Sequence, residues 1–324
     1  MSPIKEPQVC RICGTVNHTE GYSVREMMHG FRDEFLYFQC SKCDCLQITE
    51  IPANMDKYYP AKYYSFKPYE GTKYKGIAGR IKTLSYQANV NPEGFLSTLL
   101  KNLMPTDHFE ALKGINLTKQ TRILDVGCGN GDKYLYPLAE MGYKNLLGCD
   151  PYLPDTIHYP NGLVIKNTDV FEIIGAWDII IYHHSFEHVS NPLENLQQVK
   201  KLLASDGVCI ISTPTVSSYA WQHYGIYWYQ IDAPRHFFIH STTSIDLLAK
   251  EVDLQVVDTR WDSNYKQFVI SERYKNDIPM NVKNKKTIPG FIKRKIEKLK
   301  YARMANRLND QGRGDMAIFY LKTR

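Results

Sequence analysis

Four cysteines near the amino terminus have the spacing of a metal site. They form two C-x-x-C pairs separated by 26 residues: Cys10 and Cys13, then Cys40 and Cys43. Each pair can place two thiolates on one side of a metal, and two pairs complete a tetrahedral zinc site. Because the protein supplies all four ligands, this zinc would be structural, and its binding would stabilise a small module. Free buried cysteines are the alternative, and Cys45 could replace Cys43.

A glycine-rich segment, LDVGCGNG at residues 124–131, lies between an expected strand and an expected helix. Gly127, Gly129 and Gly131 allow a ligand to approach the backbone where a side chain would collide. A dinucleotide-binding loop would place another glycine at position 132, but this chain has Asp132, which would repel phosphates near the helix amino terminus. The loop therefore predicts a cofactor without a diphosphate.

Three acidic residues lie at or after the ends of successive expected strands. Asp125 lies in the first strand, and Asp150 ends the second, where a carboxylate can accept hydrogen bonds from both hydroxyls of a ribose. Asp169 follows the third strand, where it could accept one from an adenine amino group. Helix capping is the alternative role for all three. Their shared placement at strand ends favours ligand binding.

Histidines and a glutamate gather after the fourth expected strand: His183, His184, Glu187 and His188. If a helix starts there, His184, Glu187 and His188 share one face, and His236 from a later loop could join them. This face would supply either a histidine base, which we favour, or a site for a second, divalent metal. Glu187-His188 without a direct catalytic role is the plainer alternative. We expect His183 to line the cofactor instead.

The elements that must position these residues alternate along the chain. Apolar runs predict strands at residues 122–126, 145–149, 162–166, 177–182 and 208–212, with helices at 133–141 and 193–203 between them. This alternation implies crossover connections and a parallel sheet with helices on both faces. Residues 315–321 alternate like a closing antiparallel edge strand. The concentration of cysteines in the first 45 residues predicts a separate zinc-binding module.

In this order the motifs resemble those of class I S-adenosylmethionine-dependent methyltransferases, over about residues 73–324. LDVGCGNG, GCD, NTDVFE and the stretch from WDIIIYHHSFEHVSN to CIISTP carry the resemblance. It implies a Rossmann-like, mostly parallel seven-stranded sheet with helices on both faces, preceded by a zinc-ribbon-like module. We therefore expect the module at 1–70 and the methyltransferase domain at 71–324. The implied S-adenosylmethionine contacts are Asp125, Gly127, Cys128, Gly129, Asp150, Asp169 and Val170, with His183 beside them.

The front module is similar to the zinc-bearing amino-terminal part of bacterial sugar methyltransferases. CRICG, FQCSKCDCLQ and YYPAKYYSF carry this resemblance, and DAPRHF at residues 232–237 resembles a segment of the same group. These enzymes act on nucleotide sugars, polysaccharides or natural-product glycans. Sugar C-methyltransferases of this type have a long extra carboxy-terminal domain that this chain lacks, which favours O-methylation. H-x-x-E-H also resembles the metal-binding E-x-x-E-H of small-RNA 2′-O-methyltransferases, with one ligand changed.

Two further segments concern partners. Residues 217–238 are rich in aromatic side chains, which we expect to form a lid over a sugar acceptor, slightly ahead of a role in the core.

Between residues 283 and 303, nine Lys or Arg accompany one acid. Apolar residues recur there at helical spacing: Phe291, Ile292, Ile296, Leu299 and Met304. We expect a basic helical insertion at about 283–308 that packs this stripe, with peripheral membrane contact as an alternative.

Together these features predict a cytoplasmic enzyme that methylates a sugar or glycan. The 324 residues contain no apolar run long enough for a membrane span and no apolar signal-peptide core. A net charge of +6 is modest and disfavours nucleic acid as the acceptor. A zinc-ribbon RNA methyltransferase, a non-catalytic S-adenosylmethionine-binding scaffold and a quinone-type small-molecule methyltransferase are the alternatives.

Overall fold

The computed structural model describes residues 6–18, 20–59, 64–91, 94–104, 106, 108–282 and 288–324. Its eight helices are α1 (Gly76–Val90), α2 (Gly94–Leu103), α3 (Leu135–Glu140), α4 (Pro192–Leu202), α5 (Tyr219–Tyr224), α6 (Thr242–Glu251), α7 (Lys266–Lys275) and α8 (Ile288–Asp310). Short 3-10 turns are η1 (Met55–Tyr58), η2 (Tyr64–Phe66), η3 (Thr72–Tyr74), η4 (Glu110–Leu112), η5 (Val170–Glu172), η6 (Phe186–His188), η7 (Gly225–Tyr227) and η8 (Tyr229–Ile231). Over this part of the chain, no helix is long and apolar enough to cross a membrane.

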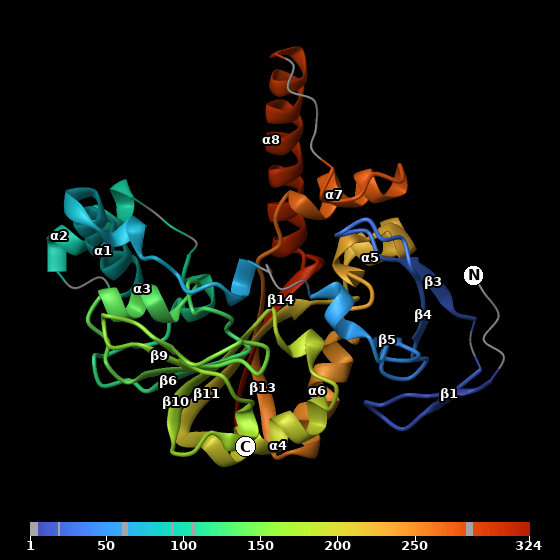
Figure 1. Ribbon diagram of the computed structural model, residues 1–324, viewed down its shortest axis with the longest axis horizontal. Coiled ribbons are helices and arrows are strands. Elements are labelled where there is room, and N and C mark those ends of the chain that lie inside the picture. Colours follow the sequence, from blue (N-terminus) through green and yellow to red (C-terminus); the bar gives the residue numbers. More distant parts are fainter. Residues whose placement is uncertain are drawn as a thin grey trace.

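The central sheet contains eight strands (Figure 1). They are β6 (Ile123–Val126), β7 (Leu146–Cys149), β8 (Ile157–His158), β9 (Val164–Lys166), β10 (Trp177–His183), β11 (Leu203–Pro214), β13 (Leu254–Trp261) and β14 (Met316–Thr323). Their spatial order is β13-β14-β11-β10-β6-β7-β9-β8, and only β8 and β14 run against the others. The predicted mostly parallel α/β sheet is therefore confirmed, with the carboxyl ends of its parallel strands at one edge.

Two details of the predicted sheet were wrong. The seven-stranded expectation missed β8, whose two residues pair antiparallel with β9 at the sheet edge and are too few to give an alternating pattern. The strand expected at 315–321 is antiparallel, as predicted, but it is not an edge strand. β14 lies between β11 and β13, and β13 forms that edge.

Apolar side chains of the strands face two separate cores. Ile123, Ile181 and Ile210 point to the face covered by α3, whereas Leu124, Ile180 and Ile211 point to the face covered by α4 and α6. This alternation between neighbouring residues is the period of a strand with both faces buried. The same alternation decides to which face of the sheet each residue at a strand end points, and the glycine loop and the histidines follow directly after those strand ends.

The amino-terminal residues form two small sheets. Their strands are β1 (Gln8–Val9), β2 (Val16–Asn17), β3 (Tyr22–Arg25), β4 (Glu34–Gln39) and β5 (Leu46–Ile48), and a sixth strand, β12 (Phe238–Ile239), joins from the methyltransferase part. The order in the larger sheet is β12-β5-β4-β3. Because β12 pairs with β5, the cysteine-bearing sheet is continuous with the segment that holds His236. The domain boundary expected at residue 70 stays a prediction.

The aromatic segment at 217–238 is mostly part of the core, which is the alternative that we considered, and a lid over an acceptor stays a prediction for its less buried residues. Its buried members are Trp221, Tyr224, Trp228, Phe237 and Phe238, which pack with the cysteines and with Leu46 and Ile48 in a third core. The small front sheet has too little apolar surface to cover itself, so these rings supply the missing core. Tyr227 is 37% exposed and stays at the surface.

Helix α8 projects from the body of the protein (Figure 1). Its last turns are anchored by the buried Ala305 and Leu308. The expectation that the helix packs its apolar stripe was wrong for Ile296 and Leu299, which are 62% and 56% exposed. Residues 283–287 of the expected insertion, and the side chains of Phe291 and Ile292, lie outside the described residues.

Candidate active site and candidate zinc site

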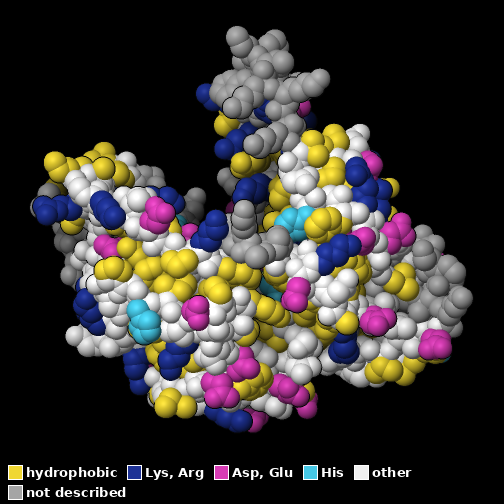
Figure 2. Space-filling view, viewed as in Figure 1, with side chains coloured by type: hydrophobic (Ala, Val, Ile, Leu, Met, Phe, Trp, Pro, Cys, Tyr) yellow, Lys and Arg dark blue, Asp and Glu magenta, His cyan; other side chains and the backbone are white. Residues whose placement is uncertain are grey.

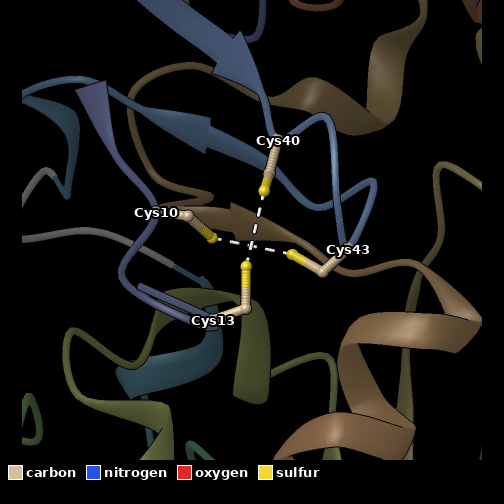
Figure 3. Close-up of side chains that lie close together, drawn as sticks. All are labelled: Cys10, Cys13, Cys40 and Cys43. Atoms are coloured by element: carbon tan, nitrogen blue, oxygen red, sulfur yellow. Dashed lines mark hydrogen bonds between the residues drawn. The ribbon is translucent and has the colours of Figure 1, made fainter. Parts of the chain in front are cut away.

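The four predicted cysteine ligands come together. Cys10 and Cys13 lie in the turn between β1 and β2, and Cys40 and Cys43 lie in the turn between β4 and β5, so that all four sulfur atoms point toward one another (Figure 3). The sulfurs lie within 4.8 Å of one another, with Cys10–Cys43 at 3.6 Å and Cys13–Cys40 at 3.5 Å. Sulfurs bound tetrahedrally at about 2.3 Å from zinc would be roughly 3.8 Å apart. We define these residues as the cysteine cluster.

The two turns of the cysteine cluster have the same local structure. In each, the residue after the second cysteine has a left-handed backbone and donates its N–H to the carbonyl of the first cysteine: Gly14 to Cys10 and Asp44 to Cys40. Cys10 also accepts hydrogen bonds from the backbone of Ile12 (3.4 Å) and from the amide of Gln47 (2.9 Å).

Such donors favour a thiolate, which is the form that binds zinc. The contact with Cys43 also lowers the pKa of the Cys10 thiol, to about 4. These observations are compatible with zinc. Cys45 is buried and its sulfur lies 4.0 Å from His240 Nδ1, outside the cysteine cluster.

The glycine loop follows β6 with a left-handed backbone at each of its three glycines. The φ angles of Gly127, Gly129 and Gly131 are 69°, 55° and 72°, a region that side-chain-bearing residues adopt only with strain. A Cβ on Gly127 would lie 2.5 Å from Ser185, and one on Gly129 would lie 2.7 Å from the carbonyl oxygen of Ser65. The glycines are therefore required by the path of the chain and by its close neighbours.

Two of the predicted cofactor acids lie directly beside this loop. Asp150 Oδ2 accepts the N–H of Gly129 (2.8 Å) and Oδ1 accepts that of Tyr152 (2.9 Å), so Asp150 holds the loop in place. Asp125 is buried in β6, and one of its carboxylate oxygens has no hydrogen-bond partner. The Nδ1 atom of His183, at the end of β10, is buried and similarly unpaired. Unsatisfied buried polar atoms at this edge fit a polar ligand.

The remaining predicted cofactor residues have structural partners. Asp169 caps η5, because its side chain accepts the N–H of Phe171 (2.8 Å). The side chain of Val170 is buried in the core, and that of Cys128 packs toward Gly148 behind the loop. Any contact of Val170 or Cys128 with a cofactor would therefore come from the backbone. The capping role that we considered for the acids is present at Asp169, whose other carboxylate oxygen could still bind a ligand.

The four predicted catalytic residues also come together, and we call them the histidine–glutamate group: His184, Glu187, His188 and His236. Glu187 Oε1 lies 3.5 Å from His184 Nδ1 and 3.9 Å from His236 Nε2. Atoms of Glu187, His188 and His236 lie within 4.8 Å of one another. The segment is a 3-10 turn rather than an α-helix, and His184 precedes it with a left-handed backbone (φ 53°).

Glu187 is fully buried and organises the group electrostatically. Its Oε2 accepts a hydrogen bond from the hydroxyl of Thr213 (3.0 Å). Burial would raise the pKa of Glu187, but the contact with His184 and the nearby His236 and His188 outweigh it, so the net pKa is lowered. Burial has the opposite effect on His184 and lowers its pKa, but the contact with Glu187 more than reverses this effect, so the net pKa of His184 is raised. Glu187 is therefore a carboxylate that stabilises positive charge on its neighbours.

Hydrogen bonds to backbone carbonyls orient the buried imidazole of His236 and the half-buried imidazole of His188. His188 Nδ1 lies 2.8 Å from the carbonyl oxygen of Arg235, and His236 Nδ1 lies 2.7 Å from that of Gln230. Because a carbonyl can only accept, each Nδ1 carries the proton, and Nε2 of the neutral ring holds the lone pair. Burial, with the neighbouring His236, lowers the pKa of His188 to about 4, so this ring is neutral at neutral pH.

Several residues that were not among the predicted site residues support the site. The hydroxyl of Tyr59 lies 3.1 Å from His188 Nδ1, and its ring stacks on that of Tyr152 at 5.6 Å. Tyr37 of β4 donates to the carbonyl oxygen of His236 (2.8 Å), and the buried Arg235 pairs with Asp232. The contacts of Tyr59 and Tyr37 join residues far apart in the chain, which no local pattern could reveal. Arg235 and Asp232 are instead three residues apart, within the DAPRHF segment.

Residues 88–259, more than half of the chain, match the protein family described as "Methyltransferase domain". The chain therefore belongs to this methyltransferase family. The match covers the glycine loop, Asp150, Asp169 and the whole histidine–glutamate group. It supports the S-adenosylmethionine-dependent methyltransferase activity that the motifs predicted.

Curated relatives match a shorter segment. The tRNA U34 carboxymethyltransferase of Campylobacter hominis is 26% identical over 115 residues, which are 32% of this chain and 40% of that protein. The enzyme of the same name from Campylobacter lari is 29% identical over 102 residues, which are 28% and 34% of the two chains. The chain thus spans less than half the length of these relatives.

Similar solved structures include the cyclopropane synthase MmaA2 of Mycobacterium tuberculosis, with a TM-score of 0.42, 14% identity and coverage of 68% of this chain and 85% of that one. Another is the O-methyltransferase of a trans-AT polyketide synthase of Brevibacillus brevis in complex with S-adenosyl-L-homocysteine, with a TM-score of 0.39, 16% identity and coverage of 73% and 78%. These similarities are too weak to carry an argument about substrate.

Proposed function

We propose that this methyltransferase acts on a hydroxyl oxygen of a sugar or glycan, with His188 as the general base. The sugar acceptor is supported by the resemblance of the front module to sugar methyltransferases. The observation that supports the base is the hydrogen bond between His188 Nδ1 and the carbonyl of Arg235, which leaves Nε2 as the basic atom of a neutral ring. A sugar hydroxyl is a weak nucleophile and benefits from such a base. The reaction would belong to nucleotide-sugar, polysaccharide or glycosylated natural-product biosynthesis in the cytoplasm.

S-adenosylmethionine would supply a methyl group on a positively charged sulfur, and the protein must align it with the acceptor. Asp150, which holds the loop through Gly129 N–H, would accept from the ribose hydroxyls, and Asp125 and His183 have unpaired polar atoms beside the loop. His188 Nε2 would take the proton of the acceptor hydroxyl as the new oxygen–carbon bond forms and the sulfur–methyl bond breaks, with S-adenosylhomocysteine as the leaving group. The buried carboxylate of Glu187 would stabilise the resulting imidazolium, and Arg235 O would keep the ring oriented.

Zinc would have a structural role in this proposal. The cysteine cluster offers four thiolates and leaves no ligand position for a substrate. A divalent ion among Glu187, His188 and His236 is the alternative to a free base. Glu187 Oε1 lies 3.5 Å from His184 Nδ1 and 3.9 Å from His236 Nε2 but has no hydrogen-bond partner, so experiment must decide between the base and the ion. Activity that needs no added divalent metal and resists chelation of exchangeable metal would support the base.

A tRNA acceptor is the second candidate, because the curated relatives bear the name tRNA U34 carboxymethyltransferase. The experiment is an acceptor screen with methyl-labelled S-adenosylmethionine, offering nucleotide sugars and glycans in parallel with total tRNA. We expect label in a sugar, and the carbon shift of the new methyl group in an NMR spectrum to be that of a methyl ether. Label in tRNA, at a rate that falls steeply with salt, would replace the sugar proposal.

A further inference from the structure

The α1–α2 hairpin exposes apolar side chains on one face of each helix. Ile77, Ile81 and Leu84 lie at positions i, i+4 and i+7 of α1, and Phe95, Leu99 and Leu103 lie at i, i+4 and i+8 of α2. Residues with these spacings share a face. Ile77, Phe95 and Leu103 are 79%, 82% and 69% exposed, and the other three are between 44% and 55% exposed.

Basic side chains outnumber acidic ones in the segment that carries this apolar surface. Residues 72–104 contain five basic side chains and one acid, Glu93; the basic residues are Lys73, Lys75, Arg80, Lys82 and Lys101. Figure 2 shows hydrophobic side chains beside Lys and Arg side chains over this hairpin. Apolar helix faces bordered by Lys and Arg are typical of helices that lie in the interface of an anionic membrane.

Helix α8 repeats the combination. Ile296 and Leu299 are exposed, and so are Lys295, Lys298 and Arg303 around them. The α1–α2 hairpin and α8 both project from the side of the protein opposite the C terminus (Figure 1). Because β14 runs antiparallel to β11 and ends near the C terminus, the two projections lie on the side where the parallel strands end. That is also the side of the histidine–glutamate group.

We propose that the α1–α2 hairpin docks this protein on an anionic lipid membrane, with α8 as a second contact. The apolar residues enter the boundary between headgroups and acyl chains, and the basic residues meet the lipid phosphates. A second copy of the chain is a poorer occupant, since two such basic surfaces would repel each other. The docked orientation turns the catalytic edge of the sheet toward the membrane. The inference is independent of the sugar acceptor and of the base.

The test is co-sedimentation of the full chain with vesicles of phosphatidylcholine containing about one quarter phosphatidylglycerol. The variant carries Ile81→Ser, Leu84→Ser, Phe95→Ser and Leu99→Ser together. Ile174→Ser with Val257→Ser serves as the matched control, because both residues are exposed apolar side chains away from the hairpin, at 83% and 48% exposure. Thermal melting and S-adenosylhomocysteine binding check that every variant is folded, and neither of these readouts involves lipid.

We expect the wild type and the control to bind the anionic vesicles. The variant with all four serine substitutions (the fourfold variant) should bind roughly 100-fold more weakly. Salt should weaken binding, and vesicles of phosphatidylcholine alone should bind less. Ile296→Ser with Leu299→Ser should give a smaller loss. Absence of wild-type binding, or equal binding by the fourfold variant, would overturn the proposal. A wild-type dimer that the fourfold variant dissociates would also overturn it, in favour of a second copy.

Discussion

In the cysteine cluster the protein encloses the converging side chains, whereas the histidine–glutamate group opens to solvent on one side. Cys10, Cys40 and Cys43 are no more than 1% exposed and Cys13 is half-buried, and every sulfur faces another sulfur. In the other group Glu187 is fully buried, but the side chain of His184 is 45% exposed. Both assemble residues from distant parts of the chain. The difference teaches that closure suits a structural ion, while a group that must meet an acceptor keeps an open side.

The largest effect should come from the cysteine cluster. Cys43→Ala removes one of the four thiolates, and structural zinc sites supply about 10–16 kcal/mol of apparent binding free energy in small modules. We expect elemental analysis of the purified variant to find no zinc. We also expect its circular dichroism spectrum to show less β-structure than that of the wild type, because the front sheet unfolds. Cys45→Ala is the matched control, because Cys45 is buried nearby but outside the cluster, and it should retain one zinc per chain. If Cys45→Ala loses zinc and Cys43→Ala keeps it, Cys45 is the fourth zinc ligand and Cys43 is not.

The next largest effect should be on turnover. His188→Ala removes the proposed base, and positioned acid–base groups typically contribute about 10²- to 10⁴-fold. We expect kcat to fall within that range while S-adenosylhomocysteine binds as it does to the wild type, measured by labelled methyl transfer and by calorimetry. His223→Ala, which changes an exposed histidine of α5, should leave both unchanged. Full turnover by the His188 variant would exclude this base.

A smaller effect should appear where the two regions join. Burial raises the pKa of Tyr37, so its hydroxyl stays protonated and donates to the carbonyl of His236. Tyr37→Phe leaves that buried carbonyl without its donor and should lower the free energy of unfolding by about 1 kcal/mol in denaturant titrations. Tyr227→Phe, at a partly exposed position, should change it much less. Equal effects of the two substitutions would mean that the bond contributes nothing.

The smallest change is expected with pH. Burial and His236 hold the pKa of His188 at about 4 rather than near its usual 6.5. The ring therefore stays neutral as the pH falls and gains a proton only near pH 4, so kcat/KM should not decline between about pH 7 and about pH 5 through this group. Rate measurements over this interval, with fluorescence to verify folding, would check it. An acid limb near pH 6.5 that His188→Gln abolishes would contradict the lowered pKa.

The sequence was informative where a function depends on local spacing. The C-x-x-C pairs, the glycine loop after β6 and the acid at the end of β7 are each a short pattern, and the structure places each at the predicted position. The alternation of strands and helices also predicted the parallel sheet, because burial on both faces produces continuous apolar runs. The members of the histidine–glutamate group were predicted only from their residue types and their order along the chain.

The rest depends on pairing between distant segments. β12 contributes only two residues to the front sheet, and its partner β5 lies almost 200 residues earlier, so neither length nor pattern indicated it. The aromatic residues at 217–238 became core because that sheet needed cover, which composition could not distinguish from a lid. Tyr59 reaches His188 across 129 positions, and the left-handed backbone of His184 has no glycine or asparagine to signal it.

The central claim is that the loop at residues 127–131 and Asp150 bind S-adenosylmethionine, and titration calorimetry with S-adenosylhomocysteine tests it most directly. We predict that the folded, zinc-loaded protein binds this product and that Asp150→Ala abolishes binding, since the variant loses both the ribose acceptor and the partner of Gly129 N–H. Asp169→Ala, at the cap of η5, should weaken binding less. Absence of binding to the wild type, or unchanged binding to Asp150→Ala, would contradict the account.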